Sequence, residues 1–281
     1  MGSSYAPAVT VTQRDKAARF LDLHRPGEPL LMPNPWDPGA AKVLAGLGFE
    51  ALATTSSGAA GARARSDGAL RRDEVIAAAA AIVAATDLPV SADMEHCFGD
   101  DAAGVAETAR LVVDAGLAGF SIEDYDRARD ERILPIDEAA ERVAAVVEVA
   151  HAGPAHVVVT ARAENHIRGR DDLDDTIARL QAYAAAGADA VFAPGLPDLA
   201  AVARVVREVD KPLNVIFRPD GPTVAELAGA GVARLSVGGS LFYVAMGALA
   251  TAAESIRADR AEYAEQLAAG VAAVKKAGFT R

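Results

Sequence analysis

The 281-residue chain has a single cysteine, Cys97, so it cannot form an internal disulfide and shows no need for an oxidising compartment. Its first twenty residues, MGSSYAPAVTVTQRDKAARF, lack the charged and then apolar regions of a signal peptide. The longest apolar segment, residues 241–253, is too short to span a bilayer, which predicts a core or interface helix. These absences predict a cytoplasmic protein that does not contact a membrane.

Basic residues are also scarce. The chain has 28 Lys and Arg against 39 Asp and Glu, which gives a formal net charge of −11. Binding to nucleic-acid phosphates requires a basic surface, and no stripe of Lys and Arg is present, so a nucleic-acid partner is excluded. Aromatic residues make up only 5% of a chain that is 51% apolar, and the abundance of Ala and Val favours close packing of helices on strands.

Short apolar runs alternate with helix-period segments along the chain. The candidate strands span residues 29–33, 50–56, 89–95, 119–124, 156–162, 189–194, 212–217 and 233–239. Several of the intervening segments begin with Asp and end with Gly, as capped helices do. Strands that are joined by crossover helices pair in parallel, and eight such units predict an α/β fold of the (β/α)8 TIM-barrel type.

The alternative is an open, doubly wound sheet, which should carry a glycine-rich phosphate turn after its first strand. That position reads NPWDPGA, without the G-x-G-x-x-G pattern, so the barrel is favoured. We expect one domain over residues 1–281, with an extra N-terminal helix within residues 1–27 and C-terminal helices in residues 240–281.

Acidic residues gather where the predicted strands end, which is where a barrel of this type forms its active site. Asp93 and Glu95 end the third strand, Glu123 ends the fourth, and Asp67 lies in the loop after the second. Residues two apart on a strand face the same side, so Asp93 and Glu95 should meet while Met94 faces the helices. Oxygen ligands favour Mg²⁺, with Mn²⁺ also accepted. Helix capping or a buried ion pair is the structural alternative.

Other polar residues fall at the same end of the predicted barrel. Arg162 ends the fifth strand and could hold a carboxylate with two hydrogen bonds, or simply neutralise the acids. The small-residue turn of Ser56, Ser57 and Gly58 offers backbone N–H groups to an oxyanion. No lysine falls at the carboxyl end of a predicted strand, which argues against a Schiff-base mechanism.

The chain resembles the isocitrate lyase and phosphoenolpyruvate mutase superfamily. The similar segments, in the order that this family has them, are ATTSSGAAGARARSDG, LPVSADMEHCFGD, GFSIED, VVVTARAENH, GADAVFAPG, KPLNVI and GVARLSVGG. The resemblance implies a modified barrel whose last helix is exchanged between subunits of a homodimer or homotetramer. It also implies a Mg²⁺-dependent reaction that makes or breaks a C–C or P–C bond beside a pyruvate-like enolate.

The resemblance assigns roles to individual residues. Asp93 and Glu95 match the metal pair, with Glu123 and Asp67 as supporting acids. The residues that match substrate-binding positions are Ser56, Ser57, Gly58, Arg162 and Asn214, and Trp36 after the first strand is a further candidate contact. Asp67, Glu123, Arg162 and His96 are the candidate catalytic residues.

Two segments depart from the family pattern. The isocitrate-type lyases carry K-[KR]-C-G-H in the lid, where this chain reads YDRARDERILPIDEAAERV. Cys97 stands at a position that is usually glycine and His96 at one that is usually small, so the loop must turn differently or accept side chains. We expect a lyase or decarboxylase for a small 2-oxo or 2-hydroxy dicarboxylate. A P–C bond enzyme and a barrel that binds ligand without turnover are the alternatives.

Overall fold

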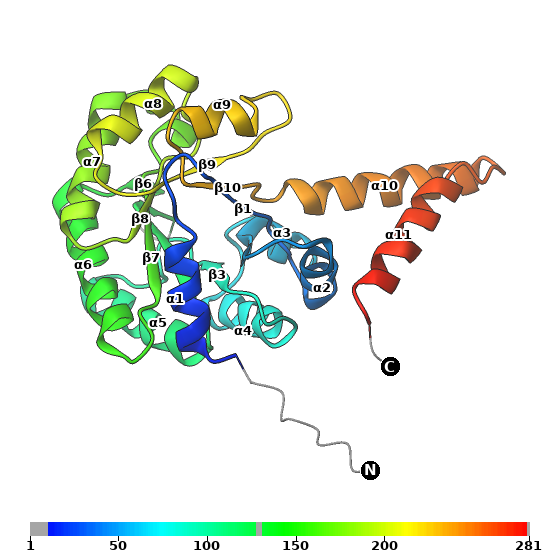
Figure 1. Cartoon of the computed structure of the whole chain (residues 1–281), viewed down its shortest axis with the longest axis horizontal. Helices are drawn as coiled ribbons and strands as arrows, with labels where there is room; N and C mark the ends of the chain where they lie inside the picture. The colour runs from blue at the N-terminus through cyan, green and yellow to red at the C-terminus, as the bar shows by residue number, and fades with distance from the viewer. Residues whose placement is uncertain (1–10, 128–130, 280–281) are drawn as a thin grey trace, which may run out of the picture.

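The computed structural model describes residues 11–127 and 131–279. Eight parallel strands form one sheet in the order β1-β10-β9-β8-β7-β4-β3-β2, with helices around it (Figure 1). The strands are β1 (Leu30–Met32), β2 (Leu52–Ala53), β3 (Val90–Asp93), β4 (Gly119–Glu123), β7 (Val158–Arg162), β8 (Ala190–Phe192), β9 (Leu213–Ile216) and β10 (Arg234–Ser236). Each lies within a segment that the sequence predicted as a strand.

The sheet curves almost into a closed barrel. β1 and β2, the two edge strands, share no ladder of hydrogen bonds, but the Ala53 amide donates to the Pro33 carbonyl at 3.1 Å. Just beyond them, the Asn34 side-chain amide donates to the Thr54 carbonyl at 2.8 Å. These two bonds join the edges, so the structure is a nearly closed (β/α)8 barrel and the predicted fold class is confirmed.

The helices of the barrel wall lie in the connections between strands. They are α2 (Pro38–Leu47), α4 (Arg72–Ala84), α5 (Ala102–Asp114), α6 (Ile136–Ala152), α7 (Leu173–Ala185), α8 (Leu199–Glu208) and α9 (Val224–Gly229). Asp37, Asp101, Asp172 and Asp198 each cap a helix by accepting from a backbone N–H of its first turn, as the sequence predicted. Two shorter helices, α3 (Ser56–Gly61) and the 3-10 helix η1 (His166–Arg168), follow β2 and β7.

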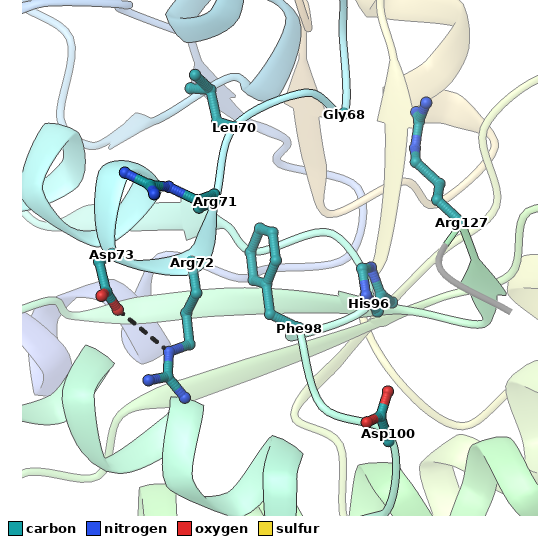
Figure 2. Close-up of a pocket in the computed structure, with 9 residues that line it drawn as sticks. All are labelled: Gly68, Leu70, Arg71, Arg72, Asp73, His96, Phe98, Asp100 and Arg127. Carbon is teal, nitrogen blue, oxygen red and sulfur yellow. Dashed lines mark hydrogen bonds and ion pairs between the residues drawn. The ribbon is translucent and has the colours of Figure 1, made fainter.

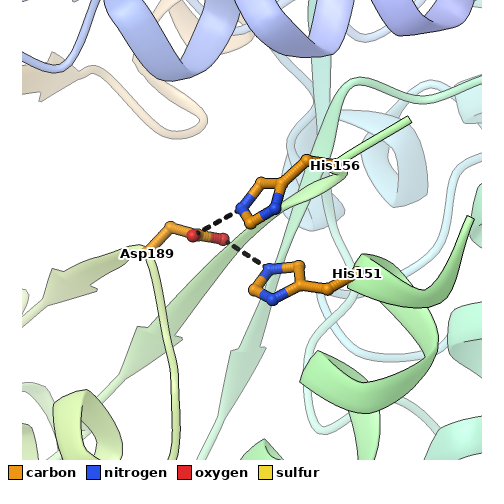
Figure 3. A group of neighbouring side chains, drawn as sticks. All are labelled: His151, His156 and Asp189. Atoms are coloured by element: carbon orange, nitrogen blue, oxygen red, sulfur yellow. Dashed lines mark hydrogen bonds and ion pairs between the residues drawn. The ribbon is translucent and has the colours of Figure 1, made fainter. Parts of the chain in front are cut away.

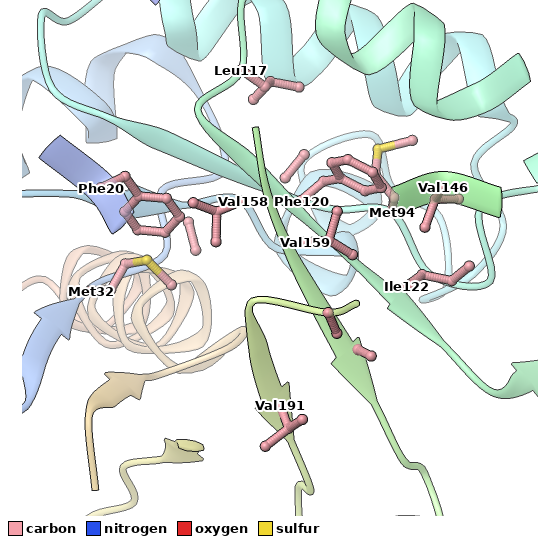
Figure 4. Close-up of a cluster of buried hydrophobic side chains, with 14 of the residues drawn as sticks. Phe20, Met32, Met94, Leu117, Phe120, Ile122, Val146, Val158, Val159 and Val191 are labelled. Atoms are coloured by element: carbon pink, nitrogen blue, oxygen red, sulfur yellow. The ribbon is translucent and has the colours of Figure 1, made fainter. Parts of the chain in front are cut away.

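Buried apolar side chains, many of them Ala and Val, form one core that covers both faces of the sheet (Figure 4). Met94, directly after β3, is fully buried with Phe120 of β4 and Val146 of α6. The sequence placed Met94 in the helix layer, and the structure confirms this. Asp93 therefore faces the barrel interior, on the opposite side of the strand.

The amino-terminal end of the barrel is covered by α1 (Gln13–Asp22), which Thr12 and Asp15 cap reciprocally. Phe20 of this helix is fully buried and packs against Gly119, where a β-carbon would lie 2.7 Å from the Phe20 ring. The predicted N-terminal helix is thus present, although residues 1–10 lie outside the described part.

The carboxyl-terminal helices lie away from the barrel. α10 (Ser240–Arg257) extends outward and α11 (Ala264–Lys276) folds back beside α2 (Figure 1). α10 carries large apolar side chains that are exposed, including Tyr243 at 62% and Val244 at 68%. None of the described helices is long and apolar enough to cross a membrane.

The pair of short strands after β4 was not predicted. β5 (Tyr125–Asp126) and β6 (Arg132–Ile133) form an antiparallel pair directly after β4, in the segment that reads as the family's lid. The pair brings Arg127 over the mouth of the barrel, where it contacts Asp67 and Glu95. Strands of two residues carry too little periodicity to be read from sequence.

Candidate active site at the carboxyl ends of the strands

A cavity of about 70 Å³ opens inside the barrel near the carboxyl ends of the strands, and we call it the central cavity. Three of the predicted site residues, Asp93, Arg162 and Asn214, line it. Arg234 and Ser236 of β10 also line it and were not predicted. The volume suffices for a few water molecules or a small polar group.

Arg162 is surrounded by carboxylates at the rim of this cavity. Its Nη1 lies 3.5 Å from Glu123 Oε2 and 4.0 Å from Asp93 Oδ1, and its Nε donates to Glu164. Burial alone would lower the pKa of Arg162, but Glu123, Glu164 and Asp93 outweigh it and raise the pKa. The neutralising role that the sequence allowed for Arg162 is therefore present in the structure.

Glu95 reaches the site through a turn rather than through a strand. β3 ends at Asp93, so the prediction of a strand to residue 95 is wrong, and Glu95 has a left-handed φ of 50°. Its backbone N–H lies 3.5 Å from Asp93 Oδ1, which keeps the two acids together as predicted. Glu95 is 3% exposed, and burial, followed by the charge of Asp93, raises its pKa to about 7.

Two carboxylate oxygens at the site are buried without a hydrogen-bond partner among the described residues. They are Oε1 of Glu95 and Oε1 of Glu123. Burial raises the pKa of Glu123 well above its ordinary value, and Glu164, Asp93 and Glu95 raise it further against Arg162. We call Asp93, Glu95 and Glu123 the acid cluster. Its possible metal-ligating atoms are all oxygens, and two of these have no hydrogen-bond partner among the described residues, which suits a hard divalent cation.

Asp67 does not line the central cavity. It lies 43% exposed above it, 3.2 Å from Arg127, whose Nε lies 3.7 Å from Glu95 Oε2. Asp67 therefore reaches the acid cluster through Arg127, and the sequence did not identify this arginine.

The predicted oxyanion turn forms the start of α3. The Ser56 amide donates to Asp93 Oδ2 at 3.1 Å, and the Gly58 amide lies 3.4 Å from the capping Thr55 hydroxyl. The Ser57 hydroxyl shares a hydrogen bond of 3.0 Å with Thr55. The turn thus lies beside the acid cluster, but the Ser56 N–H is directed to Asp93 and not to open space.

Trp36 supports this turn from outside. Its ring packs edge-to-face on Phe242 of α10 at 5.5 Å, and its β-carbon lies against Gly58. Trp36 does not line the central cavity. Its placement makes it a wall behind α3, and direct substrate contact stays a prediction.

His96 follows Glu95 in the turn after β3, and its side chain lies away from the central cavity. It lines a broad surface depression of about 550 Å³ together with Phe98, Asp100 and Arg127 (Figure 2), and not the central cavity. Burial lowers the pKa of His96, against the effect of Asp126. The structure therefore does not bring this candidate catalytic residue together with Asp93 and Arg162.

Cys97 is fully buried in the core, with Sγ 3.9 Å from the Ser121 carbonyl, and burial raises its pKa. Its φ of 58° is left-handed, so the loop keeps a glycine-like backbone and accepts a side chain there. This resolves the alternative that the sequence left open. A buried thiol with a raised pKa is a poor nucleophile.

Asp124 points away from the mouth. It accepts from Arg179 Nη1 at 3.0 Å, from the Tyr183 hydroxyl at 2.7 Å and from the Glu164 amide at 2.8 Å. The Arg179 and Tyr183 side chains come from α7, so Asp124 connects that helix to the strand ends. The bond from the Glu164 amide also fixes Glu164, the buried partner of Arg162. Neighbouring residues of a strand face opposite sides, so the order Glu123, Asp124 indicates that one carboxylate faces the cavity and the other faces the helices.

A separate polar cluster lies at the opposite end of the barrel (Figure 3). His151 and His156 place Nε2 atoms 3.0 and 2.8 Å from the two oxygens of Asp189, and their rings stack with centroids 3.7 Å apart. The Val159 amide also donates to Asp189. Imidazoles on one metal ion diverge from it, so the stacked rings indicate a hydrogen-bonded tie between α6, β7 and β8.

Comparison with known proteins agrees with this architecture. The family profile of phosphoenolpyruvate phosphomutase matches residues 20–257. An uncharacterized protein of Mycobacterium tuberculosis is 33% identical over 238 residues, which are 84% of this chain and 88% of that protein. An oxaloacetate decarboxylase of Chromohalobacter salexigens is 31% identical over 246 residues, 84% of this chain and 83% of that enzyme. A 2-methylisocitrate lyase of Halalkalibacterium halodurans is 30% identical over 225 residues, 78% and 73% of the two chains.

Solved structures give the same result. A lyase/mutase candidate from Burkholderia cenocepacia is 49% identical, with a TM-score of 0.83 over 87% of this chain and 89% of that one. A 2,3-dimethylmalate lyase is 26% identical, with a TM-score of 0.79 over 87% and 88%. Relatives of this chain thus carry out different reactions on one barrel.

Proposed function

The chain belongs to the phosphoenolpyruvate mutase family within the isocitrate lyase superfamily, and we propose that it is a Mg²⁺-dependent lyase or decarboxylase. Its substrate would be a small 2-oxo or 2-hydroxy dicarboxylate, cleaved at a C–C bond to leave a pyruvate-like enolate. The observation that carries this proposal is the acid cluster, in which buried oxygens of Glu95 and Glu123 have no partner among the described residues.

Asp93, Glu95 and Glu123 would hold the cation. When bound, Mg²⁺ would supply positive charge that stabilises the enolate oxygen as the C–C bond breaks. Burial of the cluster strengthens every electrostatic interaction within it, because little water is present to screen the charges. Mn²⁺ offers the same coordination chemistry to oxygen ligands.

Arg162 would act at the rim, where its guanidinium is held in place by Glu123, Glu164 and Asp93. A fixed guanidinium can orient a carboxylate without a further loss of side-chain entropy. Ser57 and Gly58 follow Ser56, whose amide donates to Asp93, at the start of α3, and they would contact the same substrate. The Arg127 side chain, over Glu95, would limit the entry of water from above.

We favour cleavage of a C–C bond because the relatives at 30% identity or more include a 2-methylisocitrate lyase and an oxaloacetate decarboxylase, both of which act on C–C bonds. The phosphoenolpyruvate phosphomutase profile and a phosphonomutase candidate from Burkholderia cenocepacia, 37% identical over 86% of this chain, support the P–C alternative. The lid segment is short and lacks the reactive cysteine of isocitrate-type lyases, which favours decarboxylation as the simpler reaction.

The test is a direct assay of the full-length protein with oxaloacetate and with phosphonopyruvate, each in Mg²⁺ and in a chelator. We expect Mg²⁺-dependent formation of pyruvate from oxaloacetate. Asp93→Ala should abolish it, whereas Asp73→Ala, which removes an acid that is 84% exposed on α4, should not. Turnover of phosphonopyruvate alone would assign P–C chemistry. Turnover of neither substrate above the Asp93→Ala level would support a binding protein.

The assembly is also a proposal. The exposed apolar side chains of α10 and α11, among them Tyr243, Leu249 and Leu267, suit a homodimer or homotetramer in which these helices pack on a second copy. Sedimentation as a monomer at micromolar concentration would contradict it. We propose the cytoplasm as the location, on the sequence features given above.

A further inference from the structure

Arg234 is a buried cation inside the barrel whose described contacts are all neutral. It lies on β10, is 3% exposed and lines the central cavity. Its Nε donates to Asn214 Oδ1 at 2.9 Å, and its Nη1 donates to Thr160 Oγ1 at 3.0 Å. Thr160 precedes Arg162 by two residues on β7, so Arg234 lies one side-chain layer deeper than the acid cluster.

The third contact of Arg234 is a neutral histidine. His24 Nδ1 lies 2.7 Å from the Phe20 carbonyl, which can only accept, so Nδ1 carries the hydrogen. His24 Nε2 is therefore a lone-pair acceptor and receives Arg234 Nη1 at 3.0 Å. Burial, followed by the charge of Arg234, lowers the pKa of His24 to about 3, so the ring adds no charge at neutral pH.

The charge of Arg234 is consequently uncompensated. No carboxylate of residues 11–127 or 131–279 lies within ion-pairing distance, 4.0 Å, of its guanidinium. Burial lowers the pKa of Arg234 to about 9 with no acid to oppose it, and the group stays protonated at neutral pH. A buried ion without a partner is strongly unfavourable, and proteins rarely retain one unless a ligand neutralises it.

We propose that Arg234 is an anion-binding subsite at the base of the central cavity, and that it binds a carboxylate or an anionic group of similar size. Ser236 would assist it. Asn214 Nδ2 donates to Ser236 Oγ at 3.0 Å, which leaves the Ser236 hydrogen free to point at an anion in the cavity. His24, Thr160 and Asn214 hold the guanidinium with acceptor atoms and would keep its position fixed.

The subsite deepens the proposed function and rests on it only for the identity of the ligand. A dicarboxylate has two anionic ends. A metal ion in the acid cluster and Arg162, whose charge three carboxylates already offset, would hold only the end at the mouth. Arg234 supplies the cation for the other. The substrate class it selects is therefore a compact dianion and not a monocarboxylate.

The test measures malonate binding by titration calorimetry with the full-length protein, in chelator and again in Mg²⁺, without any assay of turnover. Charge-assisted hydrogen bonds of this kind predict that Arg234→Met weakens malonate binding between about tenfold and a hundredfold. Asn214→Asp is the second variant, because it places a carboxylate 2.9 Å from Arg234 Nε and should compete with the anion to a similar degree. Arg207→Met, on the exposed face of α8, removes the same charge elsewhere and should leave binding unchanged.

The outcomes separate the subsite from the reaction. If Arg234→Met fails to fold, Asn214→Asp still decides, since it adds an ion pair and removes no atom that packs. Malonate binding that is equal in wild type, Arg234→Met and Asn214→Asp overturns the subsite, as does an absence of binding to wild type in both conditions. Binding that depends on Arg234 in a protein without lyase activity would uphold the subsite and reject the proposed reaction.

Discussion

Two arginines face the same cavity in opposite electrostatic settings. Arg162, at the mouth of the barrel, has carboxylates of Asp93, Glu123 and Glu164 around it. Arg234, one layer deeper, has Asn214, Thr160 and His24, and no acid among the described residues. The acids at the mouth therefore outnumber the arginines that contact them, and the base holds a positive charge that no acid of the described residues balances.

This difference explains how one cavity can select a ligand that has two charged ends. Excess negative charge at the mouth attracts a cation, and uncompensated positive charge at the base attracts an anion. The mouth also contains left-handed backbone at Glu95, Cys97 and Phe98, which the base does not need. Strain and unsatisfied groups of this kind concentrate at functional sites.

The largest effect is expected from Arg162→Gln. It would leave the buried Glu123 without its guanidinium and the fully buried Glu164 with Arg168 alone, so unfolding should become easier by about 3–5 kcal/mol. Turnover of the substrate found in the assays should fall by roughly 10³-fold, because the positioning charge is lost. Urea unfolding and steady-state kinetics measure the two. Arg204→Gln, which breaks only exposed ion pairs of α8 with Asp174 of α7 and with Glu208, should cost at most about 1 kcal/mol.

His24, which contacts Arg234 at the base of the cavity, predicts a pH dependence of the free energy of unfolding. Its pKa is about 3 in the folded protein against 6.5 for an ordinary histidine, so the unfolded chain binds the additional proton between these values. Stability should therefore fall as pH decreases from about 6.5 toward 3, by up to about 4 kcal/mol from this residue. His24→Gln, which cannot titrate, should lose that component. If the free energies of unfolding of wild type and variant change by the same amount from pH 8 to pH 4, the prediction is wrong.

The comparison also separates what the sequence could predict from what it could not. Asp93, Glu123 and Arg162 end apolar strands, and strand ends converge in any barrel, so their proximity followed from the fold. The location of Met94 followed from the alternation of strand side chains. Asp93 and Glu95 are together as predicted, but for a different reason, because a left-handed turn and not a strand positions Glu95.

Arg234 at the base of the cavity was not predicted, although its partner Asn214 was, because the role of Arg234 depends on three-dimensional neighbours. Arg234 begins its strand, where an arginine usually reaches solvent, and its partners come from positions 24, 160 and 214. Glu164 was overlooked for a similar reason. It follows β7 at a position that carries no periodicity, and only the contacts with Arg162 and Arg168 show its role.

At the mouth, Glu95→Gln should make the protein more stable while it removes activity. The pKa of Glu95 is about 7 in the folded protein against 4.5 for an ordinary glutamate, so ionised Glu95 destabilises the fold progressively as pH rises from 4.5 to 7. In chelator at pH 8 the variant should gain about 2–3 kcal/mol in urea unfolding, and below pH 4.5 the gain should vanish. Glu107→Gln, at an acid that is 53% exposed, is the matched control. Equal stability of the variant and wild type at pH 8 would mean that Glu95 is not desolvated.

The smallest effects come from a pair of glycines, one at each end of the barrel. A β-carbon on Gly119 would lie 2.7 Å from the Phe20 ring and 2.9 Å from the Val158 carbonyl, both of which are held by packing. A β-carbon on Gly239 would lie 2.4 Å from the Ser57 hydroxyl, which can rotate away. Gly119→Ala should lower the free energy of unfolding by about 1–3 kcal/mol, because no flexible side chain beside Gly119 can move to make room for the methyl group. KM should stay unchanged.

Gly239→Ala should show the reverse behaviour. The clash displaces Ser57 from its hydrogen bond with Thr55, so KM should rise a few-fold while the free energy of unfolding changes by less than about 1 kcal/mol. Chemical unfolding and KM are measured for both variants, and together they show whether each substitution affects stability or the substrate site. If both substitutions destabilise the fold equally and leave KM unchanged, then Ser57 braces the fold as Phe20 does. The substrate site would then not extend to the start of α3.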